Sequence, residues 1–203
     1  MKAGALRVAI LAVALLLAAC AGQRPRPVAA DAASLERQAA REGVLRAQGS
    51  DWRIEARLAV SDGGNSGSGS LDWIQQGEDF RFTVHAPVTG KTWVLSGGPG
   101  HAVLQGLASV PIEGAGASQL LERELGWHVP LPELVDWVRA MRAPGPAVIE
   151  FRPDGLPGRI EQAGWRVEYR DYAMEFDPPL PSRVFATRGE YSVRLAIRAW
   201  TLP

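Results

Sequence analysis

The sequence predicts a mainly β (α+β) protein in which one curled antiparallel sheet is joined by a small number of helices. Three observations lead to this class. Apolar and polar residues alternate in several short runs, which is the period of a strand with one buried face. Short turn-forming segments separate consecutive runs, which favours antiparallel neighbours. One stretch, residues 118–141, instead places its apolar residues at helical spacing.

The chain begins with the layout of a secretory signal peptide. Lys2 and Arg7 precede an apolar run of 12 residues, Val8–Ala19. A membrane-spanning helix needs about 20 such residues. We therefore expect residues 1–19 to be a cleaved signal peptide and not a retained span.

The end of this run resembles the lipobox of bacterial lipoproteins, whose cysteine takes a diacylglycerol: Leu17-Ala18-Ala19-Cys20. Cys20 is the only cysteine of the chain, so it has no disulfide partner, and lipidation explains it. Among lipoproteins, aspartate after the cysteine commonly signals retention in the inner membrane, and Ala21 stands here. The resemblance implies a protein held at the outer membrane by acyl chains, with its domain facing the periplasm.

Residues 20–30 are predicted to be the lipidated N-terminus and a tether, because Ala21–Ala30 has two prolines, two arginines and no apolar periodicity. A folded domain over 31–203 follows. Asp31 is suited to cap a helix. Helical spacing then recurs, although Gly43 interrupts a thin apolar face, at Leu35, Gln38, Ala39, Glu42 and Leu45.

The first predicted strand covers Trp52–Val60, where every second residue is apolar. The Gly/Ser-rich segment Asp62–Ser70 follows, and we interpret it as a loose connection between strands. It lacks the lysine and the following helix of a phosphate-binding P-loop.

The same alternation recurs further along the chain, in Leu71/Trp73, Phe80/Phe82/Val84/Ala86, Trp93/Leu95, Trp165/Val167/Tyr169 and Tyr191/Val193/Leu195/Ile197. Turn signals lie at Gln76-Gly77-Glu78-Asp79, Gly97-Gly98-Pro99-Gly100, Asp154-Gly155 and Arg188-Gly189-Glu190. Each strand therefore has one apolar and one polar face, as in an antiparallel meander.

Two helices interrupt the strands. The first contains Leu120, Leu121 and Leu125 before Gly126. The second opens at Pro130-Leu131-Pro132 and ends before Pro144-Gly145-Pro146, and its apolar stripe is Leu131, Leu134, Val135, Val138 and Met141. We expect both helices to cover the apolar face of the sheet.

No residue pattern indicates catalysis. His85, His101 and His128 are isolated and there is no second cysteine, so we expect neither a metal site nor a cofactor. The serines cluster in Asp62–Ser70 without a nearby His/Asp pattern, which argues against a hydrolase. We predict that the protein is not an enzyme.

The net charge of the mature chain argues against nucleic-acid binding. Without residues 1–19 the chain has 20 Lys+Arg against 22 Asp+Glu, so it is nearly neutral and has no strongly basic surface for nucleic acid.

Seven tryptophans stand out in this composition: Trp52, Trp73, Trp93, Trp127, Trp137, Trp165 and Trp200. They could fill a solid core. A curled sheet capped by helices could equally enclose a cavity whose apolar walls suit a hydrocarbon ligand. Periodicity does not separate these two interpretations.

An ordered set of short segments resembles the LolB family of outer-membrane lipoprotein receptors. The segments are Leu71-Asp72-Trp73-Ile74-Gln75-Gln76, Ala86-Pro87-Val88-Thr89-Gly90, Leu125-Gly126-Trp127-His128-Val129-Pro130-Leu131, Leu134-Val135-Asp136-Trp137-Val138-Arg139 with Pro144-Gly145, Gly164-Trp165-Arg166-Val167-Glu168-Tyr169 with Tyr172, Leu180-Pro181, and Arg194-Leu195-Ala196-Ile197-Arg198-Ala199-Trp200. They cover most of the mature chain in the family's order. The departures are the long Asp62–Ser70 segment and Val88, where some members have leucine.

The resemblance implies an incomplete antiparallel β-barrel with a helical lid, which encloses an apolar cavity. That cavity would accept the acyl chains of another lipoprotein from the periplasmic carrier LolA and release them into the outer membrane, without covalent chemistry. We assign its walls to Trp73, Phe82, Trp93, Leu134, Trp137, Val138, Trp165 and Tyr169. In the family, the loop that corresponds to Pro87, Val88, Thr89 and Gly90 projects an apolar side chain toward the membrane.

An alternative interpretation stays open: a structural or small-ligand-binding lipoprotein with no transfer role. In either case we expect a monomer, with outer-membrane lipid as a partner and no nucleic acid. Uptake of lipid or lipopeptide distinguishes the two functions.

Overall fold

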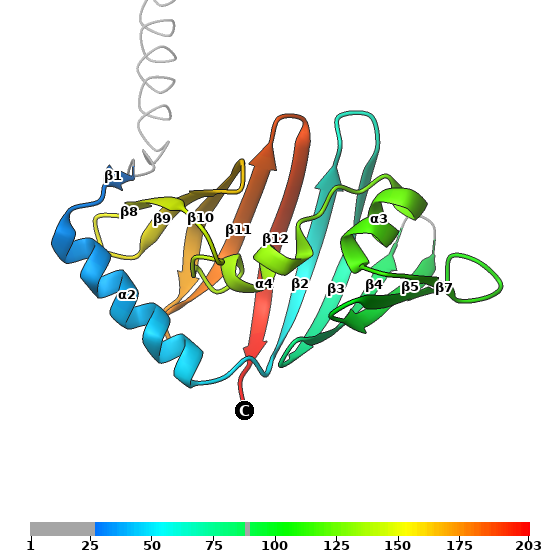
Figure 1. Cartoon of the computed structure of the whole chain (residues 1–203), viewed down its shortest axis with the longest axis horizontal. Helices are drawn as coiled ribbons and strands as arrows, with labels where there is room; N and C mark the ends of the chain where they lie inside the picture. The colour runs from blue at the N-terminus through cyan, green and yellow to red at the C-terminus, as the bar shows by residue number, and fades with distance from the viewer. Residues whose placement is uncertain (1–26, 88–89) are drawn as a thin grey trace, which may run out of the picture.

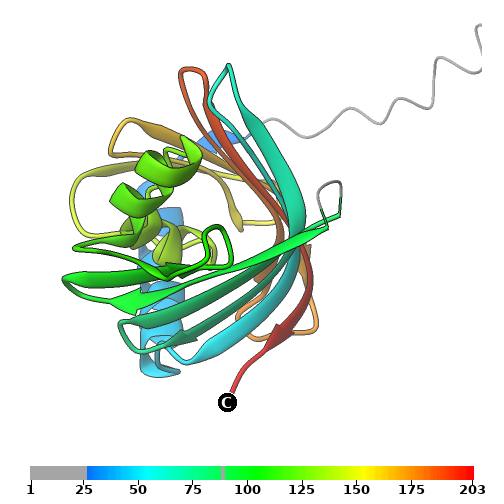
Figure 2. The same ribbon diagram turned by 90° about the vertical axis from the view of Figure 1, so that its right-hand side faces the viewer.

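A computed structural model describes residues 27–87 and 90–203, and in them a single antiparallel sheet curls around two short helices (Figures 1 and 2). The strands are β1 (Val28–Ala29), β2 (Trp52–Ser61), β3 (Ser66–Gln76), β4 (Asp79–Ala86), β5 (Lys91–Gly98), β6 (His101–Gln105), β7 (Ile112–Gly114), β8 (Ala147–Phe151), β9 (Pro157–Gln162), β10 (Trp165–Ala173), β11 (Leu180–Arg188) and β12 (Tyr191–Thr201). The helices are α2 (Ala32–Ala47), α3 (Ala117–Leu125) and α4 (Leu131–Trp137). The predicted fold class is confirmed.

Two meanders make up the sheet. In the first meander, strands β2 to β7 are neighbours in the sheet in the same order as in the chain, and the second meander orders β8 to β12 in the same way. Pairing of β12 with β2 joins the two meanders. The sheet is open, since β1 and β7 form its two edges. The connection from β7 to β8 carries α3 and α4 across the concave side (Figure 2). The alternation predicted this meander, but β1, β6, β7, β8, β9 and β11 were not predicted as strands, and β1 lies within the predicted tether.

The Gly/Ser-rich segment differs from the prediction. Only residues 62–65 form the turn, and Ser66–Ser70 belong to β3, paired with β2 from Ser61↔Ser66 to Arg57↔Ser70. The turn is tight because the Asp62 carboxylate accepts hydrogen bonds from the backbone N–H groups of Gly64 and Asn65. Backbone pairing requires no particular side chain, so glycine and serine can form a strand when a neighbouring strand, here β2, supplies the hydrogen-bond partners.

The helix predicted to reach Met141 ends at Trp137, as α4. Ala140 has a φ of 55°, in the left-handed region, and its carbonyl accepts hydrogen bonds from Gln38 and Arg41 of α2. A second guanidinium nitrogen of Arg41 donates to the carbonyl of Arg139. The helix stops because these carbonyls bond across to α2 and not along the chain.

Helix α2 begins as predicted, with Asp31 and Ser34 forming a capping box. Its buried face is mostly polar: Ser34, Gln38, Glu42 and Leu45. Glu42 is 4% exposed and accepts hydrogen bonds from Gln38 Nε2 at 2.9 Å and from Arg142 Nε and Nη2, both at 2.9 Å. Polar contacts therefore attach α2 to the segment that follows α4.

Glu42→Gln should lower the free energy of unfolding by about 1.5–3 kcal/mol at neutral pH, because charge-assisted hydrogen bonds to Arg142 are lost. Burial raises the pKa of Glu42, but the hydrogen bonds from Arg142 and Gln38 outweigh it and leave the pKa below its ordinary value of 4.5. A carboxylate with a lowered pKa in the folded state stabilises above pH 4.5, and this contribution disappears as the pH falls through the folded-state pKa. Denaturant unfolding at neutral and strongly acidic pH should therefore show a difference between wild type and variant that shrinks in acid. An equal difference at both pH values would contradict this account.

Candidate functional site

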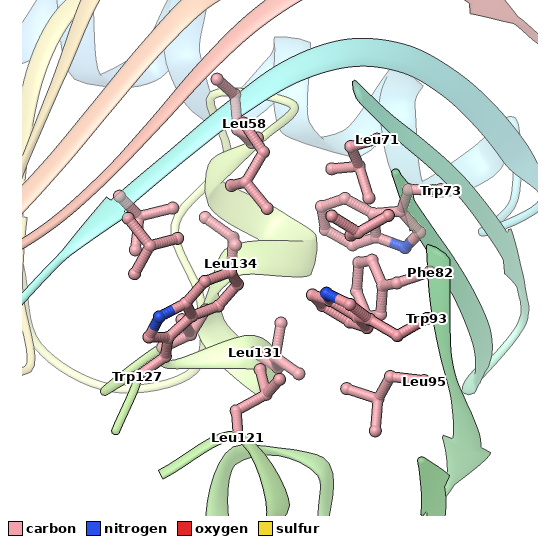
Figure 3. A pocket seen from close by; sticks show the side chains of 15 residues that line it. Leu58, Leu71, Trp73, Phe82, Trp93, Leu95, Leu121, Trp127, Leu131 and Leu134 are labelled. Carbon is pink, nitrogen blue, oxygen red and sulfur yellow. The ribbon is translucent and has the colours of Figure 1, made fainter. Parts of the chain in front are cut away.

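A small apolar cavity lies between the concave face of the sheet and the two covering helices (Figure 3). Its volume is about 30 Å³, which is room for no more than a few water molecules. All lining residues are apolar: Leu58, Val60, Leu71, Trp73, Phe82, Val84, Trp93, Leu95, Leu121, Trp127, Val129, Leu131, Leu134, Val193 and Leu195. In this state nothing in the cavity wall can bind a polar ligand, and an acyl chain does not fit.

Aromatic rings form one wall of the cavity. Trp73 is fully buried on β3, and its ring lies 4.7 Å from that of Phe82 on β4 and 4.7 Å from that of Trp52 on β2. The indole N–H of Trp73 donates to Gln75 Oε1 at 3.0 Å, so the one polar atom of this ring is satisfied outside the cavity. The wall is rigid because adjacent strands hold these rings in edge and tilted contacts.

The other wall is the helical lid, which we define as α3, the linker 126–130 and α4. Leu121 of α3 and Leu131 and Leu134 of α4 point into the cavity (Figure 3). Leu120 is fully buried and packs so closely on Gly114 of β7 that a Cβ there would lie 2.9 Å from Leu120 Cγ. Both helices thus use their apolar stripes against the sheet, as predicted.

The end of α4 and the linker are held to the sheet differently. At the end of α4, the Tyr169 hydroxyl donates to the Trp137 carbonyl at 3.0 Å, and the Trp137 indole N–H donates to Gln162 Oε1 at 3.0 Å. The linker is held by ring contacts instead: His128 stacks on Tyr191 of β12 with ring centroids 4.2 Å apart. The α4 end is therefore the fixed end of the lid.

Trp127 of the linker closes the cavity against the Gly-rich part of β3. A Cβ at Gly67 would lie 2.2 Å from Trp127 Cζ2, so the indole rests directly on the backbone of Gly67. The edge of Trp127 also meets Trp93, with ring centroids 5.7 Å apart. The glycine at this inward strand position is thus required by the lid, and Asp62–Ser70 contributes to the site.

A groove of about 600 Å³ adjoins the cavity and shares Phe82 and Leu131 with it. The β3–β4 and β5–β6 turns and the first residues of α3 and α4 line this groove. It leads from the surface to the buried rings.

The structure divides the predicted cavity residues into two groups. Four line the cavity: Trp73, Phe82, Trp93 and Leu134. Four others are buried but do not line it: Trp137, Val138, Trp165 and Tyr169. This second group packs where α4 ends against β9 and β10, with the rings of Trp137 and Trp165 6.4 Å apart.

Several lining residues were not predicted, and the sequence held a signal for some of them. Leu58 and Val60 lie on the predicted apolar face of β2, as Val193 and Leu195 do on β12. Trp127 and Val129 lie between the helices, in a segment without periodicity, so only the chain's path over β3 reveals their role.

The other predicted site residues are described only in part. Cys20, Val88 and Thr89 lie outside the described residues. Pro87 and Gly90 are exposed, next to the end of β4 and the start of β5. In the described ranges, no helix is long and apolar enough to cross a membrane, and no three His, Cys, Asp or Glu residues come together as metal ligands would.

The fold and the cavity define a class of protein, the open half-barrel with a helical lid over an apolar interior. A solved structure of the same fold is that of the LolA superfamily protein NE2245 from Nitrosomonas europaea, with a TM-score of 0.52 and 9% identity over 80% of this chain and 93% of that chain. The sequence model of the family described as "Outer membrane lipoprotein LolB" matches residues 50–200, and the chain belongs to this family.

Two relatives named outer-membrane lipoprotein LolB show how far the similarity extends. The protein from Alkalilimnicola ehrlichii is 39% identical over 204 residues, which is 100% of this chain and 99% of the relative. The protein from Xanthomonas campestris pv. campestris (strain B100) is 38% identical over 171 residues, which is 81% of this chain and 78% of the relative. The family places the chain among the outer-membrane receptors of lipoprotein localisation.

Proposed function

We propose that the cavity takes up the acyl chains of lipoprotein cargo delivered by the periplasmic carrier LolA, and that the chain then releases them into the outer membrane. In this proposal residues 1–19 are removed, Cys20 is lipidated, residues 20–30 are the tether and 31–203 are the receptor domain, which acts as a monomer without covalent chemistry. A mass increase of one diacylglycerol and one further acyl chain on Cys20 supports the anchor, and an unmodified thiol on the mature chain contradicts it.

The observation that carries the proposal is the wholly apolar lining of the cavity beneath a lid that is fixed at one end. The cavity is too small for an acyl chain, so uptake requires the linker to move away from β3 and α3 to move away from β5, β6 and β7. The acyl chain of the cargo then takes the place of the lid side chains against Trp73, Phe82 and Trp93, so these rings stay in contact with apolar groups and out of water. The transfer runs from carrier to receptor to bilayer by differences in affinity.

The small closed volume also favours a second candidate, a structural lipoprotein with a solid core. A transfer assay separates the two. The mature chain with Cys20→Ala is mixed with LolA that carries a fluorescent lipoprotein, and liposomes are added afterwards. A receptor takes the cargo from the carrier without a nucleotide and passes it to the liposomes. A structural lipoprotein leaves the cargo on LolA.

Val88→Glu should slow delivery to liposomes at least about threefold and leave acceptance from LolA unchanged. We assign Val88 to a brief contact with the bilayer, to which one valine contributes at most about 1.5–3 kcal/mol. A carboxylate at position 88, in the segment between β4 and β5, removes this contribution and adds a desolvation cost. Delivery is followed as the gain of liposome-bound cargo with time.

Two controls accompany this variant. Val88→Leu keeps an apolar tip and should deliver as well as or better than wild type. Val110→Glu introduces the same change at a valine that is 66% exposed, between β6 and β7, and should leave delivery unchanged. Wild-type delivery by Val88→Glu would make the loop an ordinary turn.

A further inference from the structure

Several arginines on the convex face of the sheet have acidic partners directly across the strands. Cross-strand neighbours on one face lie close enough for their charges to interact, and opposite charges stabilise the pair. Three such pairs combine register with an ion pair: Arg159 with Glu150, Arg166 with Glu161 at 3.1 Å, and Arg183 with Asp171 at 3.2 Å.

The centre of the convex face departs from this pattern. Arg57 of β2 pairs with Ala196 of β12, and Arg194 of β12 pairs with Ala59 of β2. Arg198 lies at the bulge of β12, two residues beyond Ala196. All three arginines are exposed, and none has an acidic group within 4 Å among the described residues. Together with Arg183 of β11, which lies directly across from Ala196 and is paired with Asp171, these arginines surround Ala196 with like charges on adjacent strands. Such an arrangement lowers stability unless an anion approaches.

An aromatic ring completes this cluster. Phe185 of β11 is the cross-strand neighbour of Arg194, whose guanidinium carbon lies 5.9 Å from the ring centroid. The guanidinium of Arg170 stacks on the same ring at 3.8 Å. A guanidinium held over a ring keeps its N–H edges directed outward, where they can donate in pairs to phosphate oxygens.

We propose that Arg57, Arg194 and Arg198, the central arginine cluster, dock the convex face of the sheet onto anionic phospholipid headgroups. The family places the chain at a membrane, so a lipid surface is the anion always within reach. Arginines beside an aromatic ring match the composition of a membrane–water interface. The lid covers the opposite, concave side, so a chain docked in this way leaves α3 and α4 accessible from the periplasm (Figure 2).

The test uses the full lipidated chain reconstituted in vesicles of phosphatidylcholine, with or without phosphatidylglycerol. Ala196→Cys places a fluorescent label inside the cluster, and Gln105→Cys places one on the outer face of β6, far along the sheet. A quencher attached to lipid headgroups reports proximity. We expect quenching at position 196 to be about threefold stronger in anionic than in neutral vesicles, to weaken in high salt, and to exceed that at 105.

Two triple variants that remove the same number of positive charges test whether the central arginine cluster causes the quenching at position 196. Arg57→Gln/Arg194→Gln/Arg198→Gln should reduce quenching at 196 to its value in neutral vesicles. Arg46→Gln/Arg53→Gln/Arg166→Gln removes the same charge from arginines that have acidic partners and are not neighbours of Ala196, and it should change little. Circular dichroism should show both sets folded, since all six side chains are exposed.

Three outcomes would overturn the proposal. One is equal quenching in neutral and anionic vesicles, and another is an equal loss in both triple variants. The third is a response of the label to soluble polyglutamate but not to anionic vesicles, which would assign the cluster to an acidic protein partner.

Discussion

Leu134→Asp should reduce the uptake of a fluorescent lipopeptide more than about tenfold while the sheet stays folded. Leu134 is 3% exposed and points from α4 into the cavity beside Trp127 and Leu131 (Figure 3). A carboxylate there would lie against hydrocarbon without a partner, which costs several kcal/mol, and each 1.4 kcal/mol lowers affinity about tenfold. The sheet stays folded because movement of α3 and the linker, with α4 in place, exposes the new carboxylate to water. Titration with lipopeptide measures uptake, and circular dichroism measures folding.

Two substitutions serve as controls. Leu134→Met keeps the volume and apolar character and should bind lipopeptide as wild type does. Val138→Asp places the same charge at a fully buried residue that does not line the cavity. We expect this variant to lose its folded structure, and not to show the folded state with lost uptake that is expected of Leu134→Asp. A folded Leu134→Asp variant with wild-type uptake would remove the cavity from the acyl-chain path.

Gly67→Val should open the lid and speed lipopeptide uptake several-fold. The new Cβ would lie 2.2 Å from Trp127 Cζ2, and the β3 backbone cannot retreat because β2 pairs along its whole length. Trp127 must therefore leave its position, at a cost of about 1–3 kcal/mol for overpacking. Stopped-flow mixing with lipopeptide measures the rate, and denaturant unfolding measures the stability.

Ser68→Val is the matched control for this variant, since it adds the same side chain at the next residue, on the exposed outer face of β3. In a Trp127→Ala background, Gly67→Val should cost no further stability, because the colliding ring is gone. If Gly67→Val leaves both rate and stability unchanged, Trp127 does not seal the cavity.

Periodicity alone was enough to predict most of the sheet. The inward faces of β2 and β12 are those the alternation indicated, since a one-residue shift would move every apolar side chain into solvent. The Asp31 cap, the end of α3 before Gly126 and the start of α4 were also predicted, because capping, chain-ending glycine and proline placement are local effects. The family resemblance was confirmed over residues 50–200.

Three features depended on contacts distant in the chain. Ser66–Ser70 forms a strand only because β2 supplies its backbone partners, and no side-chain pattern marks it. The buried face of α2 is polar because it bonds to backbone carbonyls and to Arg142 in the segment after α4, about 100 residues away. The spacing of apolar residues in α2 therefore does not show how deeply this face is buried.

Which buried residues form the cavity was likewise decided by the tertiary structure. Alternation shows that Trp73 and Trp165 both face inward. The curl of the sheet and the path of the lid then give them different surroundings: Trp73 lines the cavity, whereas Trp165 packs beside Trp137 in the solid part of the core. Trp127 reaches the cavity because Gly67, 60 residues earlier, has no side chain to exclude it. The sequence by itself thus determined the strands, their inward faces and the family, all of which follow from local periodicity and similarity. The cavity is the space left between elements that are far apart in the chain, and its position depends on how they pack.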